Sequence, residues 1–137
     1  MNKFNKLVGF IFGKLYEEFP VPLELEPNLF FGKMAEDLDE EGEFNFPDYF
    51  DSTVRWLETA GYIWMPVDKS SYDGPSYDVV LSEKGLEALR RVPVSLEGNA
   101  SIGERLATFS KTKASETLST LISLAITTAV QGTSNVP

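Results

Sequence analysis

The sequence predicts a mixed α+β domain followed by an amphipathic C-terminal helix. Apolar residues recur at helical spacing in residues 2–19 and again in 46–60, whereas 62–67 and 77–81 are rich in β-branched and aromatic residues. Helical spacing returns in the last apolar stretch of the chain. With 137 residues, 42% of them hydrophobic, the chain has room for one packed core and an appendage without disulfides.

Two helices with a short extended segment between them are predicted in the N-terminal third. The first helix covers about residues 2–19 and stops at Pro20, whose ring cannot continue the pattern. Leucines alternate with glutamates in 20–28, which suits a short extended segment or an edge strand. Asn28 is expected to cap a second helix that runs to about Leu38. The apolar residues of the first helix are Phe4, Leu7, Val8, Ile11, Leu15 and Phe19.

A helix and a β-hairpin follow an acidic turn. Pro47 suits the first turn of a helix, where a missing N–H costs nothing, and Gly61 suits its end. Strands are predicted at 62–67 and 77–81, joined by a long loop at 68–76. The inner stripe of the helix consists of Phe50, Val54 and Leu57, widened by Tyr49, Thr53, Trp56 and Ala60.

The C-terminal part is divided at a glycine-containing segment. Ser82 is expected to cap a helix that completes a domain at residues 1–95, and 96–103 is expected to be a hinge. An amphipathic helix is predicted at 104–131, followed by a disordered tail at 132–137. Its apolar stripe is Leu118, Leu121, Ile122, Ala125, Ile126 and Ala129.

Two segments of the chain follow a known order of motifs. They read Trp56-Leu57-Glu58-Thr59-Ala60-Gly61-Tyr62-Ile63 and Leu81-Ser82-Glu83-Lys84-Gly85-Leu86-Glu87-Ala88-Leu89, with the hairpin between them. This order resembles winged-helix regulators of the MarR and PadR kind, over about residues 47–91. In that family a helix ends at a Gly-Tyr-Ile-like corner, and the second wing strand runs into a Leu-Ser/Thr-x-x-Gly helix start. The resemblance implies a winged-helix-like core of three helices plus a two- or three-stranded antiparallel β-hairpin wing. A generic α+β domain with one hairpin is the alternative.

DNA binding, which the resemblance implies, is disfavoured by the charge distribution. The net charge is −9: residues 1–16 carry three lysines and no acid, and 17–51 carry twelve acids against the single Lys33. An acidic surface repels phosphate backbones. In the helix that would enter the major groove and in the wing, Asp48, Asp51, Glu58, Asp68 and Asp73 oppose only Arg55 and Lys69.

No catalytic, cofactor-binding or metal-binding residues are predicted. The chain has no cysteine and no histidine, which removes thiolate nucleophiles, the usual zinc ligands and imidazole chemistry. Residues 37–48 overlay loosely on a calcium loop, but Glu41 replaces its short fifth ligand, Asp48 replaces its final glutamate, and Pro47 stands beside that position. We therefore expect a solvated acidic turn. An acid/base carboxylate pair is also disfavoured, because no feature of the sequence buries one carboxylate and leaves another ionised.

The sequence favours a cytoplasmic protein-interaction module that is not an enzyme. Leu118–Val130, at 13 residues, is too short to span a membrane, and an amphipathic first helix is preferred to a signal peptide. The C-terminal stripe is expected either to fold back on the first helix or to pair with a second copy, and a homo-oligomer is favoured. The predicted interaction residues are Tyr72 in the hairpin tip and Leu118, Leu121, Ile122 and Ile126.

The alternative function is a dimeric winged-helix transcriptional regulator that binds DNA through two basic patches. Its candidate nucleic-acid contacts are Arg55, Lys69, Arg90 and Arg91, with Lys3 and Lys6 of the first helix.

Overall fold

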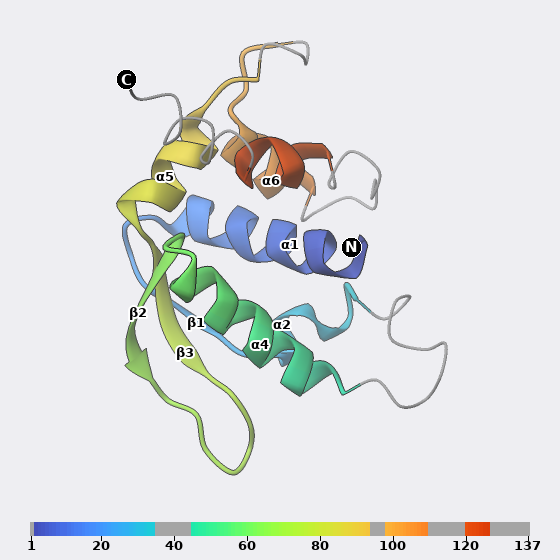
Figure 1. Ribbon diagram of the computed structural model, residues 1–137, viewed down its shortest axis with the longest axis vertical. Helices are drawn as coiled ribbons and strands as arrows, with labels where there is room; N and C mark the ends of the chain where they lie inside the picture. The colour runs from blue at the N-terminus through green and yellow to red at the C-terminus, as the bar shows by residue number, and fades with distance from the viewer. Residues whose placement is uncertain (1, 35–44, 94–97, 110–119, 127–137) are drawn as a thin grey trace.

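The computed structural model of the chain describes residues 2–34, 45–93, 98–109 and 120–126 (Figure 1). Its elements are, in order, α1 (Asn2–Glu18), β1 (Leu23–Leu25), α2 (Asn28–Phe31), α4 (Phe46–Thr59), β2 (Ile63–Asp68), β3 (Tyr77–Leu81), α5 (Glu83–Arg90) and α6 (Ile102–Phe109). Residues 120–126 are also helical. The predicted α+β class is confirmed.

Helix α1 lies in the middle of the fold, with α4 and the sheet on one side and α6 on the other (Figure 1). Residues 7–13 are all buried, so this part of α1 is covered on every side rather than along one stripe. Phe12 lies outside the predicted apolar stripe of this helix, yet it is fully buried, and its ring lies 5.9 Å from that of Tyr62. Each apolar side chain buried in this way contributes roughly 1.5–3 kcal/mol.

The sheet has three antiparallel strands in the order β1-β3-β2. The short segment predicted as an edge strand is β1, which pairs with β3 at Leu25↔Tyr77. Strands β2 and β3 form the predicted hairpin, and Ser71 and Gly74 exchange two backbone hydrogen bonds of 3.0 Å within its loop. Tyr77, Val79 and Leu81 of β3 point into the core, where α1 packs against them.

The corner between α4 and β2 satisfies the last carbonyl groups of the helix. Gly61 has a φ of +89°, and its N–H donates to the Glu58 carbonyl at 2.9 Å. The Tyr62 N–H donates to the Leu57 carbonyl, also at 2.9 Å. This pair of bonds is a Schellman motif, which requires a residue that adopts a positive φ easily. The predicted helix end at Gly61 is therefore confirmed, and the positive φ of this glycine explains it.

The start of α5 packs directly against this corner. Ser82 caps α5 as predicted: its Oγ accepts from the Gly85 N–H at 3.0 Å and donates to the Gly61 carbonyl at 2.5 Å. The Ser82 N–H donates to the Tyr62 carbonyl at 3.0 Å. A Cβ added at Gly85 would lie 2.1 Å from that same carbonyl oxygen. The two motifs that the sequence places around the hairpin thus contact each other, and glycine is needed at position 85 for space.

Helix α6 crosses α1 at two glycines. A Cβ on Gly13 would lie 2.8 Å from the Leu106 carbonyl oxygen, and one on Gly103 would lie 2.5 Å from the Tyr16 ring. Ser101 and Glu104 form a capping box at the start of α6: the Ser101 N–H donates to the Glu104 carboxylate at 2.9 Å, and the Glu104 N–H donates to Ser101 Oγ at 3.1 Å.

Three predicted boundaries differ from the structure. The second helix is the single turn α2, which begins after Pro27, and Asn28 is its first helical residue without a side-chain cap. The helix predicted from residue 104 begins at Ile102, because Ser101 caps it; Gly103, assigned to the hinge, lies inside it. The acidic turn and the middle of the predicted C-terminal helix lie outside the described residues.

We expect Gly85→Ala to lower the free energy of unfolding by about 2 kcal/mol, because the added methyl group would overlap the Tyr62 backbone and force the corner apart. Urea unfolding followed by circular dichroism measures the change. Gly32→Ala is the matched control, since Gly32 has a φ of −62° and no atom within 4 Å of its added Cβ. Equal stability of the two variants would contradict the proposed close approach.

Candidate interaction surface

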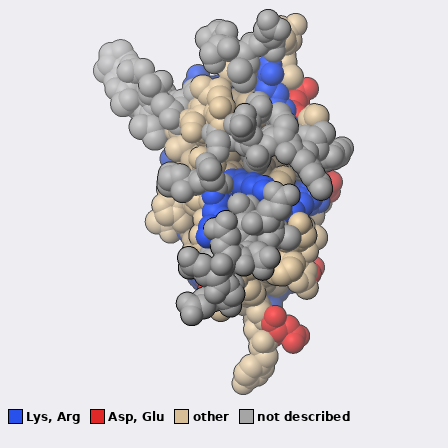
Figure 2. Space-filling model, turned by 90° about the vertical axis from the view of Figure 1, so that its right-hand side faces the viewer, with Lys and Arg blue, Asp and Glu red and all other residues tan. Residues whose placement is uncertain are grey.

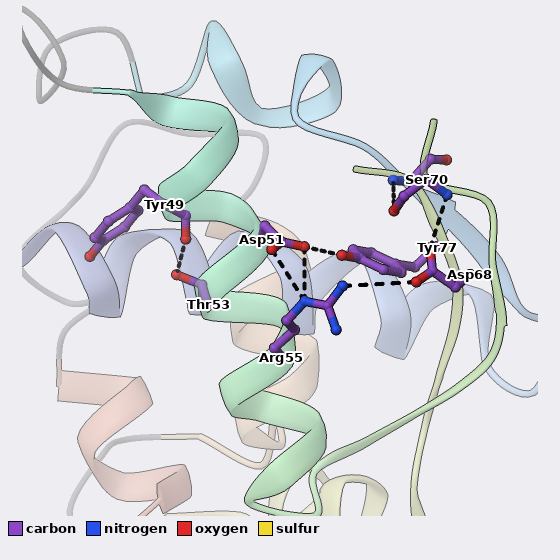
Figure 3. Close-up of polar contacts among 8 residues, drawn as sticks. Tyr49, Asp51, Thr53, Arg55, Asp68, Ser70 and Tyr77 are labelled. Carbon is purple, nitrogen blue, oxygen red and sulfur yellow. Dashed lines mark hydrogen bonds and ion pairs between the residues drawn. The ribbon is translucent and has the colours of Figure 1, made fainter. Parts of the chain in front are cut away.

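Helix α4 presents its apolar side to the core and its polar side to solvent. Asn45 caps the helix by accepting from the Asp48 N–H at 3.2 Å, and Pro47 stands in the first turn as predicted. Phe50, Val54 and Leu57 are fully buried, which confirms the predicted inner stripe. The buried Thr53 hydroxyl donates to the Tyr49 carbonyl at 2.8 Å (Figure 3). The exposed residues of the helix are mostly polar or charged, with Pro47 and Trp56 among them. The polar and charged ones are Asp48, Ser52, Arg55, Glu58 and Thr59.

Arg55, the single cation of α4, is held between two carboxylates. Its Nε lies 3.2 Å from the Asp51 carboxylate, one helical turn away, and its terminal nitrogen lies 3.8 Å from Asp68 on β2 (Figure 3). The guanidinium also lies 5.6 Å from the centre of the Tyr77 ring. The hydrogen bond that Arg55 donates to Asp51 raises the pKa of Arg55 above its usual value. The positive charge is therefore offset by neighbouring acids and faces the hairpin.

A hydrogen bond from β3 to α4 completes this cluster. The Tyr77 side chain is buried, and its hydroxyl donates to the Asp51 carboxylate (Figure 3). Burial raises the pKa of Tyr77, and the bond to Asp51 raises it further. Asp51 thus accepts from both Tyr77 and Arg55, so that the helix and the sheet are joined through one carboxylate.

The hairpin offsets its own lysine in the same way. Lys69 Nζ lies 3.2 Å from the Asp78 carboxylate. Asp68 accepts from the Ser70 N–H at 2.9 Å, and hydrogen bonding from Ser70 lowers the pKa of Asp68. We define the α4–wing surface as the outward side of residues 46–81. This stretch carries six acids and two bases, a net charge of −4, and both of its cations are paired with acids of the same surface.

The aromatic residues near this surface fall into two groups. Trp56 is 44% exposed, and its ring packs edge-on to Phe4 at 5.3 Å and stacks on Tyr62 at 6.3 Å. Trp64 and Tyr72 are more accessible, with 59% and 109% of their surface exposed. The predicted interaction residue Tyr72 is therefore fully exposed to solvent at the hairpin tip. Trp64 is also exposed, and it was not among the predicted interaction residues.

The C-terminal interaction residues lie in a different environment. Leu121 and Ile122 are fully buried in the core that contains α1, and Ile126 is partly buried against it. Leu118 lies outside the described residues. Leu121 and Ile122 therefore pack within the chain, which is the first of the two alternatives left open by the sequence.

The candidate nucleic-acid residues do not gather on one surface. Arg90 and Arg91 are exposed at the end of α5, and the tip of the hairpin that carries Lys69 lies at the opposite end of the molecule (Figure 1). Arg55 and Lys69 are each paired with acids. No continuous cationic ridge follows from these four residues.

Lysine and arginine side chains lie across the middle of the face shown in Figure 2. Within the fold, Lys33, which follows α2, approaches Lys14 of α1: burial lowers the pKa of Lys33, the charge of Lys14 lowers it further, and the charge of Glu17 opposes this change. Lys33 Nζ also lies 5.2 Å from the centre of the Phe10 ring. Local sequence patterns could not predict this approach, because Lys14 and Lys33 belong to separate elements that only the fold brings together.

The described residues hold no group of three or more carboxylates arranged to bind a metal ion. Most of the calcium-like segment lies outside them, and its last residue, Asp48, serves in the cap of α4. No buried side-chain nitrogen or oxygen in the described part lacks a hydrogen-bond partner. No helix within the described ranges is long and apolar enough to cross a membrane.

Tyr77→Phe is expected to lower the free energy of unfolding by about 1 kcal/mol at neutral pH, because Asp51 loses a hydrogen-bond donor. The pKa of Tyr77 is raised in the folded state. Its contribution is therefore complete below the unfolded value of 10.0 and is lost as the pH rises through the folded value. The wild type should lose stability above that pH, and the variant should lose less.

Urea unfolding between neutral and alkaline pH checks both parts of this prediction. Burial also raises the pKa of Tyr62, so the variant keeps part of the alkaline loss. Tyr72→Phe, at the exposed tip, should behave like the wild type. Identical alkaline profiles for Tyr77→Phe and the wild type would show that the hydroxyl makes no such contribution.

No protein-family model matches the chain, and no curated protein or solved structure matches it either. Proteins that share a fold differ in function through the chemistry of their surfaces and sites, so the charge of the α4–wing surface is the relevant observation here.

Proposed function

We propose that this chain is a non-enzymatic winged-helix domain that binds another protein through the α4–wing surface. The order of elements supports the winged-helix part of the proposal. Helix α4 ends at the Gly61 corner, the hairpin β2–β3 follows, and β3 runs into the Ser82 cap of α5. Strand β1 adds a third antiparallel strand, within the range of a two- or three-stranded wing.

The observation that carries the interaction role is the charge of the α4–wing surface. Helix α4 corresponds to the recognition helix that the resemblance implies, and such helices contact phosphates and base edges with Lys, Arg, Asn or Gln. Here the net charge is −4, and Arg55 is engaged by Asp51 and Asp68. Bringing this surface to a phosphate backbone would place like charges together, whereas a protein partner can complement them.

Gel-shift titration with a random DNA duplex at low salt tests the proposal. We expect no complex at protein concentrations up to about 10 μM, where many nonspecific DNA-binding proteins already bind. Asp51→Asn combined with Asp68→Asn is the informative variant, because it leaves Arg55 without both carboxylates and should raise any residual affinity. Tight, salt-sensitive binding of the duplex by the wild type would contradict the protein-binding proposal and favour DNA binding.

A DNA-binding winged-helix regulator is the second candidate, favoured by the approach of Lys14 and Lys33 beside α1. DNA would then contact the side of α1 rather than α4. In that case Lys14→Glu should weaken the gel shift and Arg55→Glu should leave it unchanged. The reverse result would assign DNA to the α4–wing surface instead.

Self-association is tested separately. Because Leu121 and Ile122 are buried within one chain, their side chains would have to leave the core to form a dimer interface. We therefore expect light scattering of the full-length chain to give a monomer mass across the micromolar range. A concentration-independent dimer would favour exchange of the C-terminal helix between two copies, as the dimer hypothesis requires.

A further inference from the structure

The sheet has a solvent-facing side whose residues can be assigned from the strand register. Residues directly opposite in an antiparallel pair lie on the same face. Trp64 is opposite Val80, Val67 is opposite Asp78, and Asp78 is opposite Glu24. In β3 these positions alternate with the buried Tyr77, Val79 and Leu81. We call this set the outer wing face: Glu24, Trp64, Val67, Asp78 and Val80.

The outer wing face combines exposed apolar side chains with acids. Trp64 is 59% exposed and Val67 is 45% exposed, and Val80 is partly exposed beside them. Glu24 is exposed and accepts from Ser76 at 3.0 Å, while the Asp78 carboxylate is engaged by Lys69. Asp73 follows in the hairpin loop, whereas Asp68, opposite the buried Tyr77, lies on the other side of the sheet, where it approaches Arg55. The face and this loop therefore carry three acids, Glu24, Asp73 and Asp78, against Lys69.

We propose that the outer wing face binds a basic amphipathic segment of a partner protein, with Trp64 as the central contact. This rests on the proposed function and names the chemistry of the partner. Arginine or lysine side chains complement Glu24 and Asp73, and a guanidinium stacks well on an exposed indole ring. Leucine or valine side chains of the same segment cover Val67 and Val80. Exposed aromatic residues that become buried on binding supply much of the affinity of protein interfaces.

The charge of the face argues against other occupants. A second copy of this chain would bring the same excess of acids to the contact, and nucleic acid or an anionic membrane would be repelled. Addition of a further strand at β2 is also disfavoured. Pro66 has no N–H to donate, and the register of β2 shifts between Trp64 and Val67, so the outer edge of this strand is irregular.

Isothermal titration of the full-length protein with a short amidated peptide of alternating arginine and leucine tests this proposal. The expected result is saturable binding that weakens as salt is added, with no binding of the corresponding glutamate–leucine peptide. Trp64→Ala should weaken binding about tenfold, and Glu24→Gln should weaken it less. Trp64 is exposed, so the variant should fold, and its unfolding midpoint checks that it does.

A matched pair of valines provides the control. Val67 is 45% exposed on the outer wing face, and Val92, beyond the end of α5, is 47% exposed. Val67→Ala should weaken peptide binding about threefold, whereas Val92→Ala should leave it unchanged. Absence of binding, equal binding of the two peptides, or binding unaffected by Trp64→Ala would each overturn the proposal.

These outcomes are distinct from failure of the proposed function. If the basic peptide binds and is weakened by Asp48→Asn and Glu58→Gln on α4 but not by Trp64→Ala, the α4–wing surface keeps its interaction role and the outer wing face loses it. If the duplex binds tightly in the gel shift and the peptide does not bind, both proposals fall. A monomer mass in light scattering of the protein alone would exclude a second copy as the occupant, and a dimer that dissociates on adding the peptide would overturn the proposal.

Discussion

The fold depends on the burial of α1. Because residues 7–13 are covered on every side, α1 supplies a core surface both to α4 and the sheet and to α6 and residues 120–126. The two sides are built differently. Large side chains such as Phe50 and Val54 fill the space next to the sheet, whereas Gly13 and Gly103 let α6 approach until backbone and ring atoms are in contact. The hairpin and its charged surface are held in place because α1 and α4 form a firm support behind them.

The charges of α4 and the hairpin determine which kind of partner this surface can bind. Asp51 is the centre of the arrangement, since it accepts from Tyr77 and pairs with Arg55, which also approaches Asp68. The same carboxylate therefore fixes α4 against the sheet and offsets the one positive charge that the helix could offer to a phosphate. Lys14 and Lys33 approach each other beside α1, where the charge of Glu17 also acts on Lys33. The excess of acids over bases in residues 46–81 thus lies on α4 and the hairpin.

Much of this fold could be predicted from local sequence signals. The helix end at Gly61, the cap at Ser82 and the strand at 77–81 each depend on a few neighbouring residues, and each prediction is confirmed. The failures have a common cause. A glycine among small residues predicts a hinge at Gly103, but this glycine makes room for Tyr16, which is far away in the sequence. The same long-range contact hides the helix start that Ser101 caps. The outer wing face could not be identified either, because the register of three strands is needed to place Glu24, Trp64 and Asp78 on one side.

The capping box at the start of α6 has a consequence for the acid response of the fold. The Ser101 N–H lowers the pKa of the Glu104 carboxyl, so the ionised form is favoured in the folded chain. Its contribution is complete above the unfolded value of 4.5 and is lost as the pH falls through the folded value. Acid therefore weakens the beginning of α6 and leaves the Schellman corner and the Ser82 cap, which contain no carboxylate hydrogen bond, unaffected. Local opening at low pH should therefore include the region where α6 covers α1, measured as faster hydrogen exchange on that side of α1 than at neutral pH.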